Sequence, residues 1–375
     1  MPALTWPARA SQNSPLNSAR RIQLSAVPLL GLGVFAAYAN TFRAPFVFDD
    51  VSSIVDNPTL RHLWPLSGPL SPPADWGVTV GGRPILNLTL ALDYAISGTG
   101  VWSYHVVNLA IHALAGLVLF GLARRTLLRP SMATLGARAN GIALFVASIW
   151  TLHPLQTESV TYVVQRAESL MGLFFLLTLY AFVRGVESAR PWRWWTVAFV
   201  ACGLGVGTKE VAVLAPLLVF LFDRTFVSGT FPAAWQRHRR LHLLLAATWL
   251  LAGWLLVSTG GNRGGTIGFD IGVSRLDYWL TQFEAVTRYL GLAVWPYPHV
   301  FDYGKIVPGS AGIVALWAIP VIATLALTLI ALRRWPALGF LGAWFFALLA
   351  PTSLVPGMNQ MIVEHRMYLS LAAVV

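Results

Sequence analysis

The apolar residues of this chain gather into long runs that short polar segments separate. Nine of these runs approach the roughly 20 residues that an α-helix needs to cross a bilayer. They lie at about 22–40, 106–123, 138–155, 170–184, 194–208, 210–223, 241–258, 311–332 and 336–352. A tenth run begins near residue 367 and reaches Val375 without a polar stop, so we expect the natural chain to continue beyond that residue.

Composition agrees with this pattern, because hydrophobic residues make up 56% of the chain and charged residues only 11%. A soluble domain of this length cannot bury so much apolar surface behind so few charges. We therefore predict an all-α polytopic membrane protein, a bundle of about ten or more transmembrane helices. The single cysteine, Cys202, lies inside an apolar run, which excludes an intrachain disulfide and a cysteine-based zinc site.

The net charge of +11 does not indicate nucleic-acid binding, because the basic residues stand at the ends of the apolar runs. With the N-terminus on the inner side, the inner segments carry 16 of the 26 Lys and Arg residues, as the positive-inside rule expects. Of the 15 acidic residues, only Glu187 and Asp223 lie inside. The concentration of carboxylates outside favours a working surface on the outer face.

We divide the chain into a disordered cytoplasmic tail over 1–21 and a membrane domain over 22–375. The domain has two long outer loops, at about 41–105 and 259–310. A helix is expected at 84–97. The second loop contains an amphipathic helix, with Leu276, Trp279, Leu280, Phe283, Val286, Leu290 and Val294 on an apolar face and Asp277, Thr281, Glu284 and Arg288 opposite. This pattern is typical of a helix lying in the membrane interface.

The segment FVFDDVSSIVDNP, residues 46–58, places Asp49 and Asp50 directly after the first apolar run. One interpretation is a hydrated turn, since Asp is common in turns and at helix N-caps. The other is a base or a metal ligand held where the membrane ends. Adjacent side chains diverge, so one carboxylate should face a site while the other supports the loop. Asp49 is our choice for the base.

Other outer segments bring charges to the lipid boundary. HPLQTESVTYVVQRAESL, residues 153–170, carries His153, Glu158, Arg166 and Glu168; GTKEVAVLAP carries Lys209 and Glu210; VEHRMYLS carries Glu364, His365 and Arg366. Charges at this depth usually face a cavity or pair with each other. Arg166 could snorkel or pair with Glu168, and Lys209 could sit at a hairpin tip among headgroups.

A stripe on the second run, His105, Asn108 and His112, falls on one helical face. Such a stripe more often makes hydrogen bonds between helices than it binds a metal. We therefore name no metal ligand and no definite cofactor, although a divalent metal stays open.

These pieces fit a substrate that joins a phosphate to a lipid tail, such as a polyprenyl-phosphate sugar. Phosphate is already a good leaving group, so the reaction needs a base for the incoming hydroxyl and positive charge for the departing phosphate. We assign Asp49 as that base, and Arg166, Lys209 and Arg366 as the phosphate-binding cations. In-line displacement between the two would invert the sugar.

Several segments resemble a known family in the same order. They are the Asp-Asp segment with GGRPILNLTLALDYAISGTGVWSYHVVNLAIHALAGLVLF, HPLQTESVTYVVQRAESLMGLFFLLTLYAF, GTKEVAVLAPLLVFLFD, VTRYLGLAVWPYPHVFDYG and VEHRMYLS. Over about 40–375 the chain resembles the transmembrane and tetratricopeptide-repeat O-mannosyltransferases and their bacterial relatives, members of the GT-C glycosyltransferase superfamily.

The resemblance implies a lipid-phosphate mannose donor, dolichyl in eukaryotes and polyprenyl in bacteria, and a Ser/Thr acceptor on protein. It also maps the catalytic acid of GT-C enzymes onto the Asp49–Asp50 pair. Within the matching segments we expect supporting or substrate-binding roles for Arg83, His105, His153, Glu158, Glu168, Glu210, Arg288, Asp302, Tyr303, Glu364 and His365. The family's tetratricopeptide repeats would follow Val375.

The sequence thus predicts an inverting glycosyltransferase in a bacterial inner membrane with its site facing the periplasm, or in the ER membrane of a eukaryote. Its partners would be the lipid-linked donor, a protein or other hydroxyl acceptor and membrane lipids. Two alternatives stay open: a transporter or flippase of a lipid-linked anion, which needs no base at Asp49, and a non-catalytic membrane scaffold.

Overall fold

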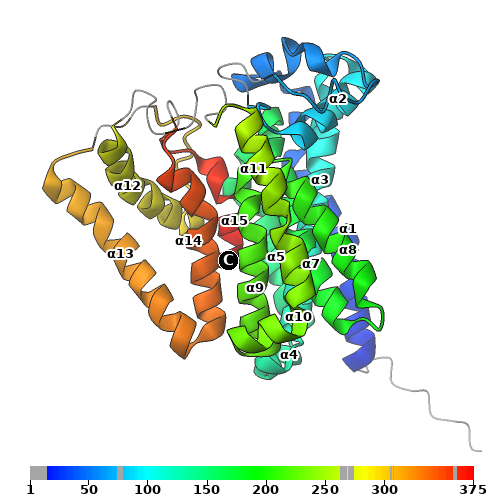
Figure 1. Ribbon diagram of the computed structural model, residues 1–375, viewed down its shortest axis with the longest axis vertical. Helices are drawn as coiled ribbons and strands as arrows, with labels where there is room; N and C mark the ends of the chain where they lie inside the picture. The colour runs from blue at the N-terminus through cyan, green and yellow to red at the C-terminus, as the bar shows by residue number, and fades with distance from the viewer. Residues whose placement is uncertain are drawn as a thin grey trace, which may run out of the picture.

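The structure is a computed structural model that describes residues 15–73, 79–261, 268, 274–304, 306, 308–357 and 361–375, with side chains from Ile22 onward. Every regular element in these residues is a helix, so the predicted all-α membrane fold is confirmed. The main helices form an upright bundle, with α2 at one end and α4 at the other (Figure 1).

The α-helices are α1 Pro15–Tyr38, α2 Pro84–Ser97, α3 Val101–Leu127, α4 Ala133–Gly136, α5 Ala139–Leu152, α6 Thr157–Thr161, α7 Arg166–Glu187, α8 Pro191–Val206, α9 Ala215–Phe222, α10 Phe231–Ala246, α11 Thr248–Ser258, α12 Arg275–Val294, α13 Ala311–Arg334, α14 Pro336–Leu354 and α15 Met367–Ser370. Short 3₁₀ or π turns, among them Val51–Val55, Glu210–Leu214 and Asp223–Ser228, connect or extend them.

Seven helical stretches of the described residues are long and apolar enough to cross a membrane. An eighth is the segment Pro130–Gly136 with α5, if this pair, bent by 88°, counts as one span. Of the nine complete runs expected from the sequence, α8 is the exception, because it has only 16 residues. Where the tenth run was expected to begin, the chain makes α15, which is buried in the bundle, and a 3₁₀ turn, Leu371–Ala373, in which Leu371 is buried.

The core of the bundle is organised around α7, which lies against α3, α8 and α9. Its apolar side chains Phe175, Leu176, Leu179 and Phe182 are almost completely buried. Small residues allow this close packing, as glycine does in many membrane helices. A Cβ added at Gly172 would lie 2.5 Å from the ring of Tyr368, so glycine is needed where α15 approaches α7.

Two expectations about helices need correction, one about where α1 begins and one about which face of α12 is buried. Helix α1 begins at Pro15, so part of the segment 1–21, which we expected to be a disordered tail, is helical; residues 1–14 lie outside the described residues. The amphipathic helix of the second outer loop exists as α12, but its buried face carries Tyr278, Thr281 and Tyr289. Thr281 was expected on the polar face, but it is buried together with Tyr278 and Tyr289.

Candidate active site

The Asp-Asp loop, residues 46–58, follows the helical turn that ends the first spanning stretch. Its backbone is strained at Phe48, which has a positive φ of 45° although it is not glycine. A π turn, Val51–Val55, follows immediately. This local path turns the two neighbouring carboxylates into different environments: Asp50 is 1% exposed, and Asp49 is partly exposed.

Asp50 closes the loop onto the outer hairpin. One of its carboxylate oxygens accepts from the backbone N–H of Val47 at 3.1 Å, and the other accepts from the backbone N–H of Val164 at 2.8 Å. Burial raises the pKa of Asp50 to about 6, against the lowering effect of these two hydrogen bonds. With both oxygens occupied inside the protein, Asp50 is placed to support the loop.

Asp49 presents its carboxylate at the edge of this structure. Its Oδ2 accepts a hydrogen bond from the Thr79 hydroxyl at 3.0 Å, and its backbone N–H donates to the Tyr162 hydroxyl at 2.9 Å. Partial burial raises the pKa of Asp49, while the Thr79 hydrogen bond and the nearby charges of His365 and Arg83 oppose that rise. Asp49 is therefore oriented by its neighbours and still reachable from outside.

Aromatic contacts hold the second outer loop against the Asp-Asp loop. The ring centroid of Phe301 lies 4.9 Å from that of Phe48 and 5.2 Å from that of Tyr162. Asp302, the next residue, is exposed and close enough for its charge to raise the pKa of Asp49. Segments far apart in sequence thus meet beside Asp49.

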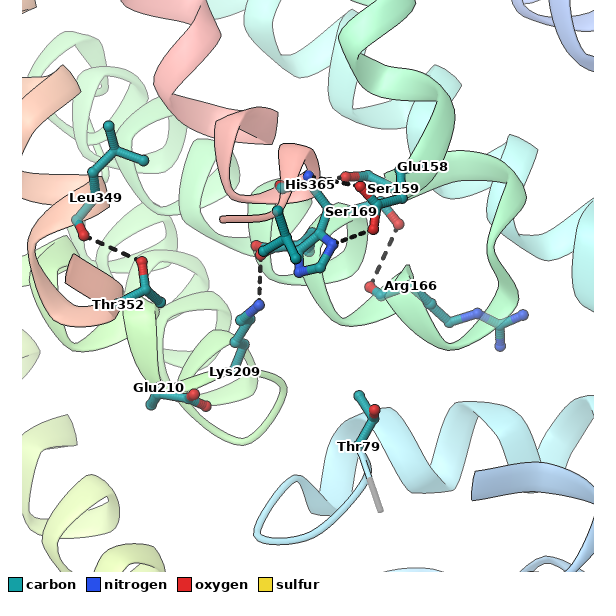
Figure 2. Close-up of polar contacts among 12 residues, drawn as sticks. Thr79, Glu158, Ser159, Arg166, Ser169, Lys209, Glu210, Leu349, Thr352 and His365 are labelled. Atoms are coloured by element: carbon teal, nitrogen blue, oxygen red, sulfur yellow. Dashed lines mark hydrogen bonds and ion pairs between the residues drawn. The ribbon is translucent and has the colours of Figure 1, made fainter. Parts of the chain in front are cut away.

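The segment 363–366 ties these outer elements together. The backbone N–H of His365 donates to Glu158 at 3.0 Å, and His365 Nδ1 lies 2.5 Å from the other oxygen of that carboxylate. Figure 2 shows this contact between the outer hairpin and the C-terminal segment. Glu364 accepts from the backbone N–H of Val300 at 2.8 Å and from the Tyr303 hydroxyl at 3.0 Å, and it pairs with His299.

A second group of charged residues consists of Lys209, Glu168 and Arg366, the last residue of the segment 363–366. Lys209 is buried and pairs with Glu168 at 2.5 Å, so it does not sit at an exposed hairpin tip. Glu168 and Arg366 line the same small cavity, together with Met171, Val211, Leu348, Thr352 and Leu369. Arg83 makes a bidentate pair with Glu210 at 3.0 to 3.2 Å.

Arg166 differs from the sequence-based expectation. It is fully buried and pairs with Asp93 at 2.6 Å, and it donates to Asn108 and to the backbone oxygens of Thr89 and Tyr104. In Figure 2 its guanidinium points away from His365. The sequence suggested pairing with Glu168 or contact with phosphate, but the guanidinium is enclosed by α2 and α3 and pairs with Asp93.

Three other predicted residues, His105, His153 and Arg288, contact groups other than the Asp49 carboxylate. His105 contacts the backbone oxygen of Ala44 at 3.1 Å, and His153 contacts that of Ala293 at 3.2 Å while capping the next turn. Arg288 pairs with Glu284 at 2.6 Å in the expected i,i+4 arrangement. The contacts of His105 and His153 join separate segments of the fold, whereas the pair of Arg288 and Glu284 lies within α12.

Sequence reasoning missed Thr79, Tyr162 and Asp93. Tyr162 lies in a segment that we had singled out, but nothing in the local pattern indicates that its hydroxyl reaches the backbone of Asp49. Asp93 lies on one face of α2 among apolar residues, and such a buried acid is the signal that could have predicted a partner for Arg166.

Comparison with known proteins supports the family resemblance. Residues 82–255 match the family model described as dolichyl-phosphate-mannose-protein mannosyltransferase. The mouse protein O-mannosyl-transferase TMTC2 is 33% identical over 237 residues, which cover 58% of this chain and 27% of that protein. Its Drosophila melanogaster counterpart Tmtc2 is 31% identical over 287 residues, 72% of this chain and 29% of that protein.

Human protein O-mannosyl-transferase TMTC3 is 30% identical over 217 residues, 56% of this chain and 22% of that protein. The chain thus spans less than a third of the length of these curated relatives. No solved structure matches. Residues 82–255 of this multi-pass membrane chain thus match the dolichyl-phosphate-mannose-protein mannosyltransferase model, and the chain is similar in sequence to part of the TMTC protein O-mannosyl-transferases.

Proposed function

We propose that this protein is a membrane mannosyltransferase that moves mannose from a polyprenyl- or dolichyl-phosphate donor to a hydroxyl acceptor, with Ser or Thr of a protein as the acceptor. The observation that carries the proposal is the difference in environment between the two carboxylates of the Asp-Asp loop. Asp50 is sealed by two backbone N–H groups, whereas Asp49 is partly exposed and oriented by Thr79. The homology to protein O-mannosyl-transferases supports the same reaction class.

In this proposal Asp49 is the general base. It removes the proton from the acceptor hydroxyl as the oxygen forms a bond to C1 of mannose, and the bond between C1 and the phosphate oxygen breaks. The electron pair of that bond leaves with the lipid phosphate, which needs no strong acid because phosphate is a weak base. Attack opposite to the leaving group inverts the configuration at C1.

Lys209 and Arg366 are proposed to hold the donor phosphate. Both lie beside Glu168, one in a buried ion pair and the other across the small cavity. A phosphate entering here would share these cations with the carboxylate, and charge-assisted hydrogen bonds would stabilise its developing charge. Arg166, which the sequence suggested as a third phosphate-binding cation, is left out of this proposal, because its buried guanidinium pairs with Asp93 and donates to Asn108.

We place the reaction at the outer end of the bundle, which faces the periplasm in a bacterium or the ER lumen in a eukaryote. The apolar helices below would hold the lipid tail of the donor in the bilayer. An acceptor would then approach Asp49 from the aqueous side, past the exposed side chains of Phe48 and Phe301.

The test uses the full-length protein purified in detergent with a panel of polyprenyl-phosphate sugars and an acceptor peptide containing Ser and Thr. Asp49→Asn should lower the transfer rate at least about 100-fold, because a general base contributes about that much or more. Asp50→Asn should also abolish transfer, through loss of the loop geometry.

Asp56→Asn is the matched control, because Asp56 is an exposed acid of the same loop. It should keep the full rate. A double variant at Asp49 and Asp50 that folds and transfers sugar normally would overturn the proposal. EDTA in a parallel assay tests whether the reaction requires a divalent metal.

A further inference from the structure

Three ligand-type side chains meet near the end of the bundle opposite Asp49, where α10 lies in Figure 1. Asp223 follows directly after α9, and His238 and His242 stand four residues apart on α10. Both imidazoles contact the carboxylate of Asp223. None of these three residues takes part in the reaction proposed above.

The coordinating atoms converge on one point. Asp223 Oδ2 lies 2.7 Å from His238 Nδ1 and 2.9 Å from His242 Nε2. One ligand atom from each residue can be chosen so that all three lie within 4.8 Å of one another. Two imidazole nitrogens and one carboxylate oxygen are a donor set that zinc and related divalent metals bind.

Two irregular stretches of backbone, a π turn and a helix kink, bring these three side chains together. The chain leaves α9 through the π turn Asp223–Ser228, in which the Ser228 hydroxyl donates to Asp223 Oδ1 at 2.7 Å. Helix α10 is kinked at His238, where φ is −124° and ψ is 19°. The serine fixes the second carboxylate oxygen, as outer-shell partners of metal ligands do, and leaves Oδ2 aimed at both histidines.

Burial also favours a cation at this position. Asp223 is 0% exposed, and a buried carboxylate is costly unless opposite charge neutralises it. In the described part of the chain, the ion-pair partners of Asp223 within 4.0 Å are the two histidines, which carry charge only when protonated. Arg129 acts on Asp223 from farther away and is itself paired with Glu187 at 3.3 Å.

The surroundings limit access of water to the cluster. The Phe182 ring lies 5.6 Å from the His238 ring, and the Phe220 ring lies 4.9 Å from the His242 ring, both in edge-on contact. His242 is 6% exposed, while His238 is more accessible. An ion reaching the cluster past His238 would therefore bind in a largely dry environment, with a water as its fourth ligand.

We propose that Asp223, His238 and His242 form a binding site for one divalent transition-metal ion of the zinc type. The ion would replace the hydrogen bonds between the carboxylate and the imidazoles and would join the π turn after α9 to the kinked α10. This inference is independent of the mannosyltransferase proposal, because the site lies at the other end of the bundle. Its role would be to stabilise that end.

The experiment measures metal binding by the full chain in detergent after treatment with EDTA and addition of Zn²⁺. Wild-type protein should retain about one zinc ion per chain after desalting. Asp223→Asn and His242→Ala should lower the zinc affinity by more than about 10-fold, and Ser228→Ala should lower it by about 10-fold through its effect on the carboxylate.

His62→Ala is the matched control, because His62 is exposed and lies on the first outer loop. It should bind zinc like the wild type. Equal zinc retention by the wild type and Asp223→Asn would overturn the proposal, as would failure of the wild type to retain zinc.

A second measurement uses only wild-type protein, so that it does not depend on the folding of variants. Zn²⁺ should protect His238 from diethyl pyrocarbonate, detected by peptide mass spectrometry, and leave His62 fully reactive. Equal modification of His238 with and without Zn²⁺ would contradict the site.

Discussion

At the scale of single residues, the adjacent Asp49 and Asp50 have different environments because the loop that carries them is held from both sides. Asp50 lies inward, where backbone N–H groups of Val47 and Val164 stabilise its charge. Asp49 lies at the rim, where its carboxylate accepts a hydrogen bond from the Thr79 hydroxyl. The sequence-based choice of Asp49 as base and Asp50 as support stays a prediction, and this geometry supports it.

The pH dependence of transfer should report the ionisation of Asp49. Its pKa is raised by burial, and a base must be deprotonated, so activity should fall as pH decreases through a value above the ordinary 3.8. The Thr79 hydrogen bond lowers this pKa, so Thr79→Val should move the acidic limb of the kcat/KM profile to higher pH. A limb that stays in place in Thr79→Val would contradict this assignment.

At the scale of elements, the buried pair of Arg166 and Asp93 joins three helices. Arg166 begins α7, Asp93 belongs to α2, and Asn108 of α3 accepts from the same guanidinium. A charge enclosed in this way needs its partner, since an unpaired buried charge is far more costly than the pair. The pair therefore holds α7, α2 and α3 together beside the Asp-Asp loop.

Removing one partner of this pair should destabilise the protein strongly. We expect Asp93→Leu to lower the free energy of unfolding by about 3–5 kcal/mol, whereas Asp93→Leu combined with Arg166→Met should lose clearly less. Thermal unfolding in detergent, followed by tryptophan fluorescence, measures both. A double variant less stable than Asp93→Leu alone would show that the pair has another role.

At the scale of the whole molecule, the outer surface is assembled from four distant parts of the chain. The first outer loop, the hairpin around Glu158 and the end of the second outer loop all contact the segment 363–366 or each other. Glu364 connects this segment to His299, Val300 and Tyr303. The candidate site therefore depends on residues near the end of the described chain.

Glu364→Ala should loosen residues 299–304 without unfolding the bundle. Losing one buried hydrogen-bond acceptor costs about 1–3 kcal/mol, so amide exchange in this segment should become about 10-fold faster or more, and transfer should slow. Hydrogen-exchange mass spectrometry measures the first effect. Asp277→Asn, at an exposed acid of α12, is the control and should change neither. Unchanged exchange in Glu364→Ala would rule out this connection.

Much of the fold could be predicted because its signals are local. The apolar runs anticipated most of the spanning helices, and α8 differs because its helix has only 16 residues. The face of α12 could not be predicted, because membrane and protein core are both apolar. Its tyrosines turn inward since their hydroxyls find acceptors there, such as Thr352 O for Tyr278 and Val363 O for Tyr289.

The sequence by itself determined the membrane class, the helical elements and the position of the Asp-Asp loop, because run length, charge at the ends of runs and adjacent acids depend only on neighbours in the chain. Only the tertiary structure decided the partners of the polar residues. In an apolar interior each buried charge takes the partner that packing brings near, so Arg166 meets Asp93, Lys209 meets Glu168, and Asp223 meets two histidines.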